Sequence, residues 1–273
     1  MRTEASRTEQ QRAGARFDFA HSCARYLELV DDERIAVAEQ SLWEMLEWEA
    51  LDGLRIMDTG SESGPFSLAA RNLAPAVHSF GYDPESVGCT QALCGCYRTG
   101  DEGCIIEGGD VLDEDCLDKL AIFDVVYSWG MLHHTVDMWR ALANMFSLVN
   151  EGGQLFVALY NDQRWLSKCW IRVKLTYIKG ELERSAIIAV HAPYFLARHT
   201  VKWVVSSSSQ KKRGMDPRRD ILDWLGGYPF VVARPEAVLA FYLQHCYTLN
   251  RMTTVDGHHG CNEFVFRAPS VDR

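Results

Sequence analysis

Residues 54–70 read LRIMDTGSESGPFSLAA, and this stretch decides the fold. The apolar run before Asp58 is typical of a short buried strand, and the pair Gly64 and Pro65 is typical of the start of a helix. Between them, Gly60 permits a tight turn, and Gly64 allows a backbone or a ligand to approach closely. The stretch therefore predicts a strand, a glycine loop and a helix, which is how open parallel sheets hold phosphate-like or polar ligands.

Strands and helices alternate on both sides of this stretch, beginning with a helix predicted at 26–48 from its three- and four-residue apolar spacing. The alternation indicates an α/β fold with a Rossmann-like, doubly wound sheet of seven strands. The last strand is expected to be antiparallel and to pair with its predecessor across the turn GHHGC. After the first strand, further strands are predicted at 76–83, 104–112, 123–129, 154–160, 247–255 and 262–268.

The alternation breaks after Tyr160. We predict a helical cap at 1–50, a sheet domain at 51–162 and 228–273, and a basic, aromatic-rich helical lid inserted at 163–227. From Arg164 to Arg219 the chain has thirteen Lys and Arg and three acidic residues, whereas the whole chain has a net charge of −9. A basic segment in an acidic protein indicates an anionic ligand or a peripheral membrane contact, and a solvated helical face is the alternative.

Composition places the chain among soluble globular proteins, with 47% hydrophobic and 24% charged residues. The N-terminus lacks an apolar secretory segment, so a cytoplasmic location with reduced thiols is expected for the nine cysteines. Five of these cysteines lie between Cys89 and Cys116, but their spacing matches no zinc pattern, so we predict buried free thiols and no metal. The sequence gives no indication of oligomeric state.

Polar residues follow the later strands as well: Asp83, Asp110 and the phrase SWGMLHHT at 128–135. With the glycine loop, this pattern resembles the class I S-adenosylmethionine-dependent methyltransferases. The phrases VHSFGYDPESV, FDVVYSWGMLHHT, EGGQLFVALYNDQ, DWLGGYPFVVA and GCNEFVF more narrowly resemble a bacterial subgroup related to the quinone-biosynthesis methyltransferases.

The resemblance implies S-adenosylmethionine as the cofactor and assigns its contacts. It implies that the glycine loop binds the methionine end of the cofactor and that the acid and the apolar residue after the third strand bind the adenine. The residues after the fourth strand are implied to lie near the sulfonium. Two positions depart from the family pattern: Glu62 stands where the loop has a glycine, and Gly81 stands where an acid binds the ribose, so Asp83 is the substitute. The implied cofactor residues are Asp58, Gly60, Ser61, Gly64, Asp83, Asp110, Val111, Ser128, Trp129 and Gly130.

His133 and His134 are the candidate catalytic residues, because an oxygen or nitrogen acceptor must lose a proton during methyl transfer. Packing or a backbone hydrogen bond is the alternative for either ring. The aromatic and cationic residues of the insertion, Lys174 and Tyr177 among them, either close over an acceptor or form core and solvated surface. A metal site in the HHGCNE turn is disfavoured, since its geometry is not standard. The candidate substrate residues are Tyr160, Asn161, Asp162, Trp165, Arg172, His258 and His259.

The leading hypothesis is methyl transfer to a small-molecule acceptor, aromatic or amphiphilic and carrying an acidic group. The alternative, motivated by Glu62 and Gly81, is a degenerate methyltransferase fold with weakened cofactor binding that acts as a binding or partner protein. Nucleic acid is not expected as a partner, because the chain is acidic overall and shows no nucleic-acid-binding module.

Overall fold

A computed structural model of the protein describes residues 30–46, 53–61, 63–205 and 217–270. The chain forms two compact units. Within the described residues, the sheet unit runs up to Gln163 and resumes at Val231, and the inserted unit runs from Arg164 to Phe230. Most of the predicted helical cap at 1–50, together with Glu62 and the segment 206–213, lies outside the described residues.

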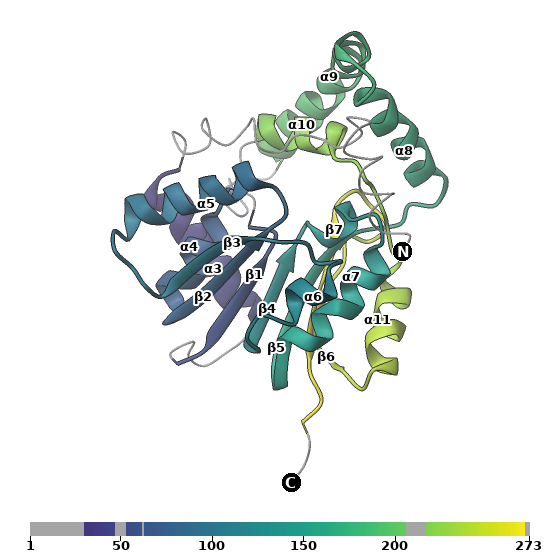
Figure 1. Cartoon of the computed structure of the whole chain (residues 1–273). Helices are drawn as coiled ribbons and strands as arrows, with labels where there is room; N and C mark the ends of the chain where they lie inside the picture. The colour runs from purple at the N-terminus through teal and green to yellow at the C-terminus, as the bar shows by residue number, and fades with distance from the viewer. Residues whose placement is uncertain (1–29, 47–52, 62, 206–216, 271–273) are drawn as a thin grey trace. The chain divides into compact units, whose positions relative to one another are not determined.

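A seven-stranded sheet forms the centre of the sheet unit, in the order β3-β2-β1-β4-β5-β7-β6 (Figure 1). The first five strands are parallel, and β7 is antiparallel to both β5 and β6. This confirms the predicted fold class, including the hairpin at the end of the chain. The strands are β1 (Arg55–Thr59), β2 (Ala76–Gly81), β3 (Cys104–Gly108), β4 (Phe123–Trp129), β5 (Val149–Tyr160), β6 (Thr248–Thr253) and β7 (Cys261–Arg267).

Helices cover both faces of this sheet (Figure 1). Alternate residues of each central strand point to opposite faces, so Val125 and Tyr127 pack with the first helices whereas Val126 packs with the later ones. One face has α3 (Asp32–Leu46), α4 (Pro65–Leu73) and α5 (Pro84–Tyr97); the other has α6 (Glu114–Leu117), α7 (Met138–Asn144) and α11 (Pro235–Gln244), with short 3₁₀ turns η2 (Leu132–His134) and η3 (Met145–Leu148).

Several boundaries differ from the sequence prediction. The third strand ends at Gly108, because Asp110 and Leu112 form a turn instead of continuing the ladder. The glycines of NEGG do not end a helix; they lie inside β5, where a register shift between Phe123 and Val125 absorbs the extra residues. The single-turn helix α6 was not predicted.

The inserted unit contains α8 (Trp165–Tyr177), α9 (Glu181–Val205) and α10 (Pro217–Gly226). Lys174 on α8 is fully buried, and its Nζ donates to the carbonyl oxygen of Trp224. The same Nζ lies 4.8 Å from the ring centres of both Trp224 and Phe230, a cation–π arrangement. The prediction that the cations of this segment lie on a solvated surface is therefore wrong for Lys174. None of the described helices is long and apolar enough to cross a membrane.

Seven of the described cysteines are free thiols, and one is not. Cys89 is disulfide-bonded, which corrects the expectation of reduced thiols throughout. Among the described residues, no group of three or more His, Cys, Asp or Glu side chains is placed to hold a metal ion.

The turn after β3 supplies a test of this packing. A Cβ added at Gly109 would lie 2.1 Å from the ring of the buried Phe80, whereas one added at Gly108 would meet only the carbonyl oxygen of Gly81 at 3.7 Å. We expect Gly109→Ala to lower the free energy of unfolding by about 1–3 kcal/mol through overpacking. Gly108→Ala is the matched control, with a change of less than about 1 kcal/mol. Urea denaturation of the two variants measures the difference, and equal effects would contradict the packing described.

Candidate cofactor site and active site

Five loops leave the carboxyl ends of the parallel strands at one edge of the sheet. In open α/β sheets ligands bind at this edge, outside the strand ends. The loop after β1 is tied to its neighbours on both sides: Gly60 N donates to Phe80 O of β2 at 2.7 Å, and Ser128 Oγ of β4 donates to Thr59 O at 3.2 Å. These bonds bring together the candidate cofactor residues of the first, second and fourth strands.

Asp58 is a buried carboxylate near the carboxyl end of β1, with an exposed fraction of 2%. Its Oδ2 accepts from Ser67 Oγ at 2.6 Å, and Ser67 Oγ lies 2.9 Å from Ser79 Oγ. Burial raises the pKa of Asp58 to about 6, and the Ser67 hydrogen bond partly opposes that rise. Ser67 and Ser79 were not predicted as site residues; a serine in the first turn of α4 beside an acid is the only sequence signal for them.

The two loop glycines have no room for a side chain. Both have positive φ, +87°, a conformation that glycine adopts at little cost. A Cβ at Gly60 would lie 2.4 Å from Met131 Cβ, and a Cβ at Gly64 would lie 2.9 Å from Thr90 Cα. Thr90 Oγ1 also donates to the buried Ser61 at 3.1 Å. The loop is thus held in shape by α5 and by the loop after β4.

Gly81 ends β2 without a side chain that could bind a ribose, and Asp83 follows two residues later. Asp83 is the N-cap of α5: its Oδ2 accepts from Ser86 N at 3.0 Å and from Ser86 Oγ at 2.7 Å. No hydrogen bond to Asp83 Oδ1 is made by the described residues. A Cβ at Gly81 would approach Val87 Cγ2 to 3.0 Å, so an acid at that position needs Val87 to move slightly.

The predicted adenine and sulfonium residues are placed as follows. Asp110 Oδ1 accepts from Leu112 N at 2.8 Å, and Val111 is buried in the main core. Trp129 Nε1 donates to Glu263 Oε1 of β7 at 3.1 Å, a pairing that was not predicted. Gly130 has φ +79° and no heavy atom of the described residues within 4 Å of an added Cβ, so its backbone is open to a ligand.

His133 and His134 form an aromatic cluster with Tyr160. The His133 ring centre lies 3.7 Å from that of Tyr160, and the His134 ring packs edge-on to both. His133 is fully buried, and its Nδ1 accepts from Tyr160 N at 3.3 Å, which places the proton of the neutral ring on Nε2. His134 is also buried, with an exposed fraction of 7%.

The remaining candidate substrate residues separate into two groups. Asn161 is buried, donates to His258 O at 3.3 Å and accepts from Asn262 Nδ2 at 3.0 Å, so it ties the end of β5 to the β6–β7 hairpin. On that hairpin His258 is exposed and His259 is partly buried, while Asp162 pairs with Arg234 at 3.6 Å. Trp165 and Arg172 belong to the inserted unit, where both side chains are exposed.

The residues at this edge match most of the contacts that an adenosyl sulfonium cofactor needs. A buried carboxylate and two side-chain-free loop positions match the methionine end, and the open backbone at Gly130 lies at the centre of the edge. The carboxylate expected at Gly81 is missing, and Asp83 is the acid in the same loop. Such a cofactor supplies a methyl group already activated by the sulfonium.

The strand order and the five strand-end loops define the class I methyltransferase fold. Residues 31–212, about two thirds of the chain, match the family described as "Methyltransferase domain". The chain belongs to this methyltransferase family, and its cofactor is S-adenosylmethionine. No curated protein matches the chain in sequence.

Solved structures share the fold at low sequence identity. The N-methyltransferase NodS of Bradyrhizobium japonicum WM9, in complex with S-adenosylhomocysteine, aligns with a TM-score of 0.52 and 16% identity over 93% of this chain and 100% of its own. An O-methyltransferase family protein of Burkholderia thailandensis aligns with a TM-score of 0.56 and 11% identity, over 93% of this chain and 62% of its own. Magnesium protoporphyrin IX methyltransferase of Synechocystis PCC 6803 aligns with a TM-score of 0.50 and 12% identity, over 88% of each chain.

The buried carboxylate predicts a pH-dependent stability. Because the folded-state pKa of Asp58 is about 6 and the ordinary value is 3.8, the folded protein holds the proton more tightly than the unfolded chain. The charged form therefore costs stability above about pH 6, and the cost disappears as the pH falls toward 4. We expect Asp58→Asn to raise the free energy of unfolding by about 1–3 kcal/mol at pH 7.5 and to change it little at pH 4.

Urea denaturation at the two pH values measures this difference. Asp113→Asn is the matched control, because Asp113 is half-buried and its side chain makes no cap hydrogen bond. Equal destabilisation by Asp58→Asn at both pH values would contradict the account.

Proposed function

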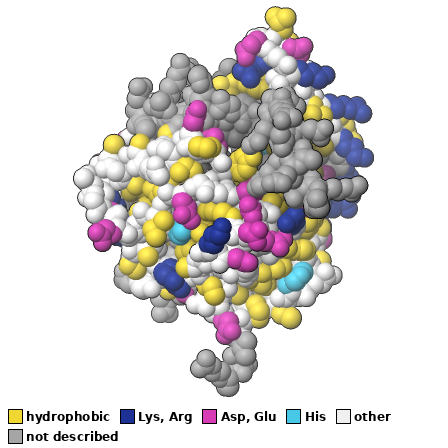
Figure 2. All heavy atoms as spheres, viewed as in Figure 1, with side chains coloured by type: hydrophobic (Ala, Val, Ile, Leu, Met, Phe, Trp, Pro, Cys, Tyr) yellow, Lys and Arg dark blue, Asp and Glu magenta, His cyan; other side chains and the backbone are white. Residues whose placement is uncertain are grey.

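We propose that the protein transfers the methyl group of S-adenosylmethionine to a small molecule that is aromatic or amphiphilic and carries an acidic group. The observation that carries the acidic preference is the charge of the inserted unit. Lys and Arg side chains gather over α8 and the turn that follows it (Figure 2), and Lys168, Arg172 and Lys179 are exposed there. Clustered cations attract and orient anionic ligands. We further propose membership of the subgroup related to the quinone-biosynthesis methyltransferases, on the five phrases of the sequence.

The attachment of the insertion supports its role in acceptor binding. The insertion leaves the sheet unit after Gln163, and the chain rejoins that unit at Val231. Ala233 N donates to Tyr160 O at 3.0 Å, Asp162 N donates to Ala233 O at 3.1 Å, and Val231 N donates to His133 O at 3.0 Å. The two chain segments that flank the insertion, both in the sheet unit, are therefore joined at the carboxyl edge near the candidate catalytic histidines. Peripheral membrane contact through the same cations, and a cytoplasmic location, remain predictions.

His134 is the proposed general base of the pair. Its ring has some exposure, whereas the ring of His133 is fully buried and holds the end of β5 through Tyr160 N. A base must reach the acceptor proton within hydrogen-bond distance, and His134 is better placed for that. His133 is proposed as the positioning residue, because it fixes the stack with Tyr160 against which His134 packs.

Asp83 is the proposed ribose-binding acid. One of its oxygens caps α5, and the other makes no hydrogen bond with the described residues. A carboxylate can accept several hydrogen bonds at once, so capping and ribose binding are compatible.

The proposal predicts a preference among acceptors. With labelled S-adenosylmethionine, small aromatic carboxylic acids bearing a hydroxyl group are expected to be methylated, and their neutral amides are expected to react at least tenfold less well in kcat/KM. Arg172→Glu is expected to raise KM for the acids with little effect on kcat, because it alters binding and not the reacting groups. Arg184→Glu is the control, since Arg184 already pairs with Glu181 at 2.9 Å.

Equal rates for acids and amides would contradict the acidic preference. The competing function, a degenerate fold acting as a binding or partner protein, is favoured by the missing carboxylate at Gly81. It would be supported if the wild type bound no cofactor and the Glu62→Gly/Gly81→Asp variant did, since that variant restores both family contacts.

A further inference from the structure

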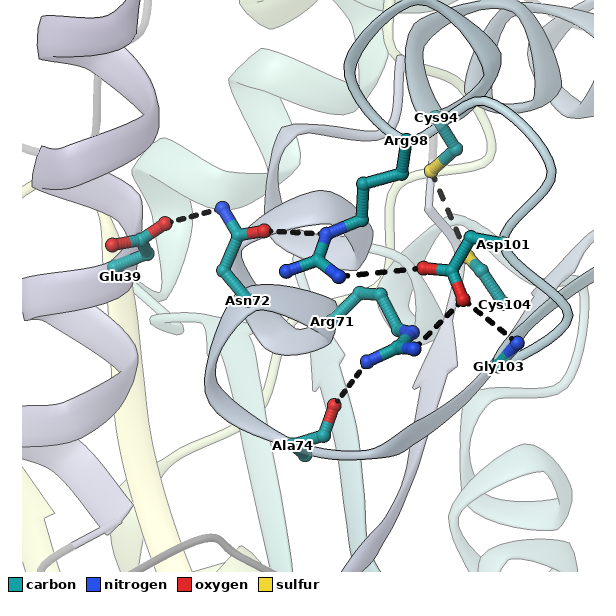
Figure 3. Close-up of polar contacts among 9 residues, drawn as sticks. All are labelled: Glu39, Arg71, Asn72, Ala74, Cys94, Arg98, Asp101, Gly103 and Cys104. Atoms are coloured by element: carbon teal, nitrogen blue, oxygen red, sulfur yellow. Dashed lines mark hydrogen bonds and ion pairs between the residues drawn. The ribbon is translucent and has the colours of Figure 1, made fainter.

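Two cysteines from different elements meet outside the cofactor site (Figure 3). Cys94 on α5 and Cys104 at the start of β3 have their sulfur atoms 3.7 Å apart, and both thiols are free. Cys94 has an exposed fraction of 6%, whereas Cys104 is partly exposed on a strand at the edge of the sheet. The pair thus joins a buried thiol to one that solvent reaches.

The backbone around Cys104 is fixed by charged side chains. Asp101 binds the Arg71 guanidinium at 2.7 Å, and its Oδ1 accepts from Gly103 N at 2.9 Å (Figure 3). Arg98 Nη1 adds an ion pair with Asp101 at 3.5 Å. A Cβ at Gly103 would lie 2.4 Å from Arg71 Nη2, so Arg71 packs directly on the residue before Cys104. The two sulfur atoms are therefore held near each other by an ordered network.

The environments of the two thiols differ. The hydrogen bond between the two sulfur atoms lowers the pKa of Cys104, and the Arg71 charge acts in the same direction. The same hydrogen bond, together with burial, raises the pKa of Cys94. A more acidic, exposed thiol beside a buried one is the arrangement in which the first reacts with an oxidant and the second resolves the product.

We propose that Cys94 and Cys104 are a modification site, a dithiol that hydrogen peroxide oxidises reversibly to a disulfide. The Cys104 thiolate attacks a peroxide oxygen, the O–O bond breaks, and hydroxide leaves and is protonated to water. The resulting sulfenic acid is attacked by the Cys94 sulfur; the S–O bond breaks and a second water leaves as Cys94 loses its proton. Two thiols lose two electrons and two protons, and one peroxide is reduced to two waters.

The disulfide has a consequence for the cofactor loop. A disulfide needs the sulfur atoms about 2.05 Å apart, so α5 and β3 must move toward each other or the side chains must rotate. Cys94 lies four residues after Thr90, on the same side of α5. Thr90 supports the loop through Ser61 and limits the space at Gly64. Oxidation is therefore expected to weaken cofactor binding. The modification site itself does not depend on the proposed acceptor chemistry.

The test is oxidation of the full chain with a small excess of hydrogen peroxide, followed by digestion with trypsin without reductant. Cleavage at Arg71, Arg98 and Lys119 gives one peptide with Cys89, Cys94 and Cys96, which carries the existing disulfide at Cys89, and a second peptide with Cys104 and Cys116. We expect these peptides to be joined, with fragmentation placing the link at Cys94 and Cys104, and to separate after dithiothreitol. Affinity for S-adenosylhomocysteine, measured by calorimetry, is expected to fall at least threefold on oxidation and to recover on reduction.

Matched variants locate the bond. Cys96→Ser and Cys116→Ser are expected to keep the link, whereas Cys104→Ser and Cys94→Ala are expected to lose it and to keep their cofactor affinity after peroxide. Unlinked peptides in the oxidised wild type, or Cys104 found only as sulfinic acid, would overturn the site. A link that forms without any change in cofactor affinity would overturn its connection to the loop.

Discussion

A buried carboxylate near the carboxyl end of β1 constrains the whole site. Asp58 is the second-to-last residue of β1, where it is almost fully removed from water and accepts a hydrogen bond from the hydroxyl of Ser67. Burying a charge is costly unless hydrogen bonds or an opposite charge compensate for it. One hydroxyl compensates only in part, so the pKa of Asp58 stays raised. We interpret this residual cost as the stability that the fold gives up so that a negative charge faces the ligand edge.

The loop after β1 is then shaped by close packing. Gly60 is confined by Met131 and Gly64 by Thr90, so the loop after β4 and helix α5 both determine its conformation. Because Thr90 and Cys94 both lie on α5, we expect a movement of α5 to change the shape of the cofactor loop. This is the proposed connection between the dithiol at Cys94 and Cys104 and ligand binding. Within the sheet unit, the hydrogen bonds of Ala233 hold together the two chain segments that flank the insertion, close to the histidine cluster.

The sequence predicts the architecture well because it depends on local patterns. The apolar strands, the glycine loop and Pro65 and Pro84 at helix starts each report on their own segment. The site is less predictable, because it depends on contacts between segments distant in the sequence. Ser79 reaches Asp58 only through Ser67, and Glu263 reaches Trp129 only because β7 and β4 both flank β5. Burial of Lys174 was unexpected for the same reason, whereas the disulfide at Cys89 was unexpected because reduced thiols were inferred from the N-terminal sequence.

The central claim is that this chain binds S-adenosylmethionine through an altered ribose contact made by Asp83. The most direct measurement is calorimetric titration of S-adenosylhomocysteine into the wild type and the Asp83→Asn variant, with Asp113→Asn as control. Asparagine caps helices as well as aspartate does, so α5 is preserved while the charge is lost. The account predicts binding to the wild type and the control, and affinity about tenfold to a hundredfold lower for Asp83→Asn. Unchanged affinity of Asp83→Asn, or no binding by the wild type, would contradict it.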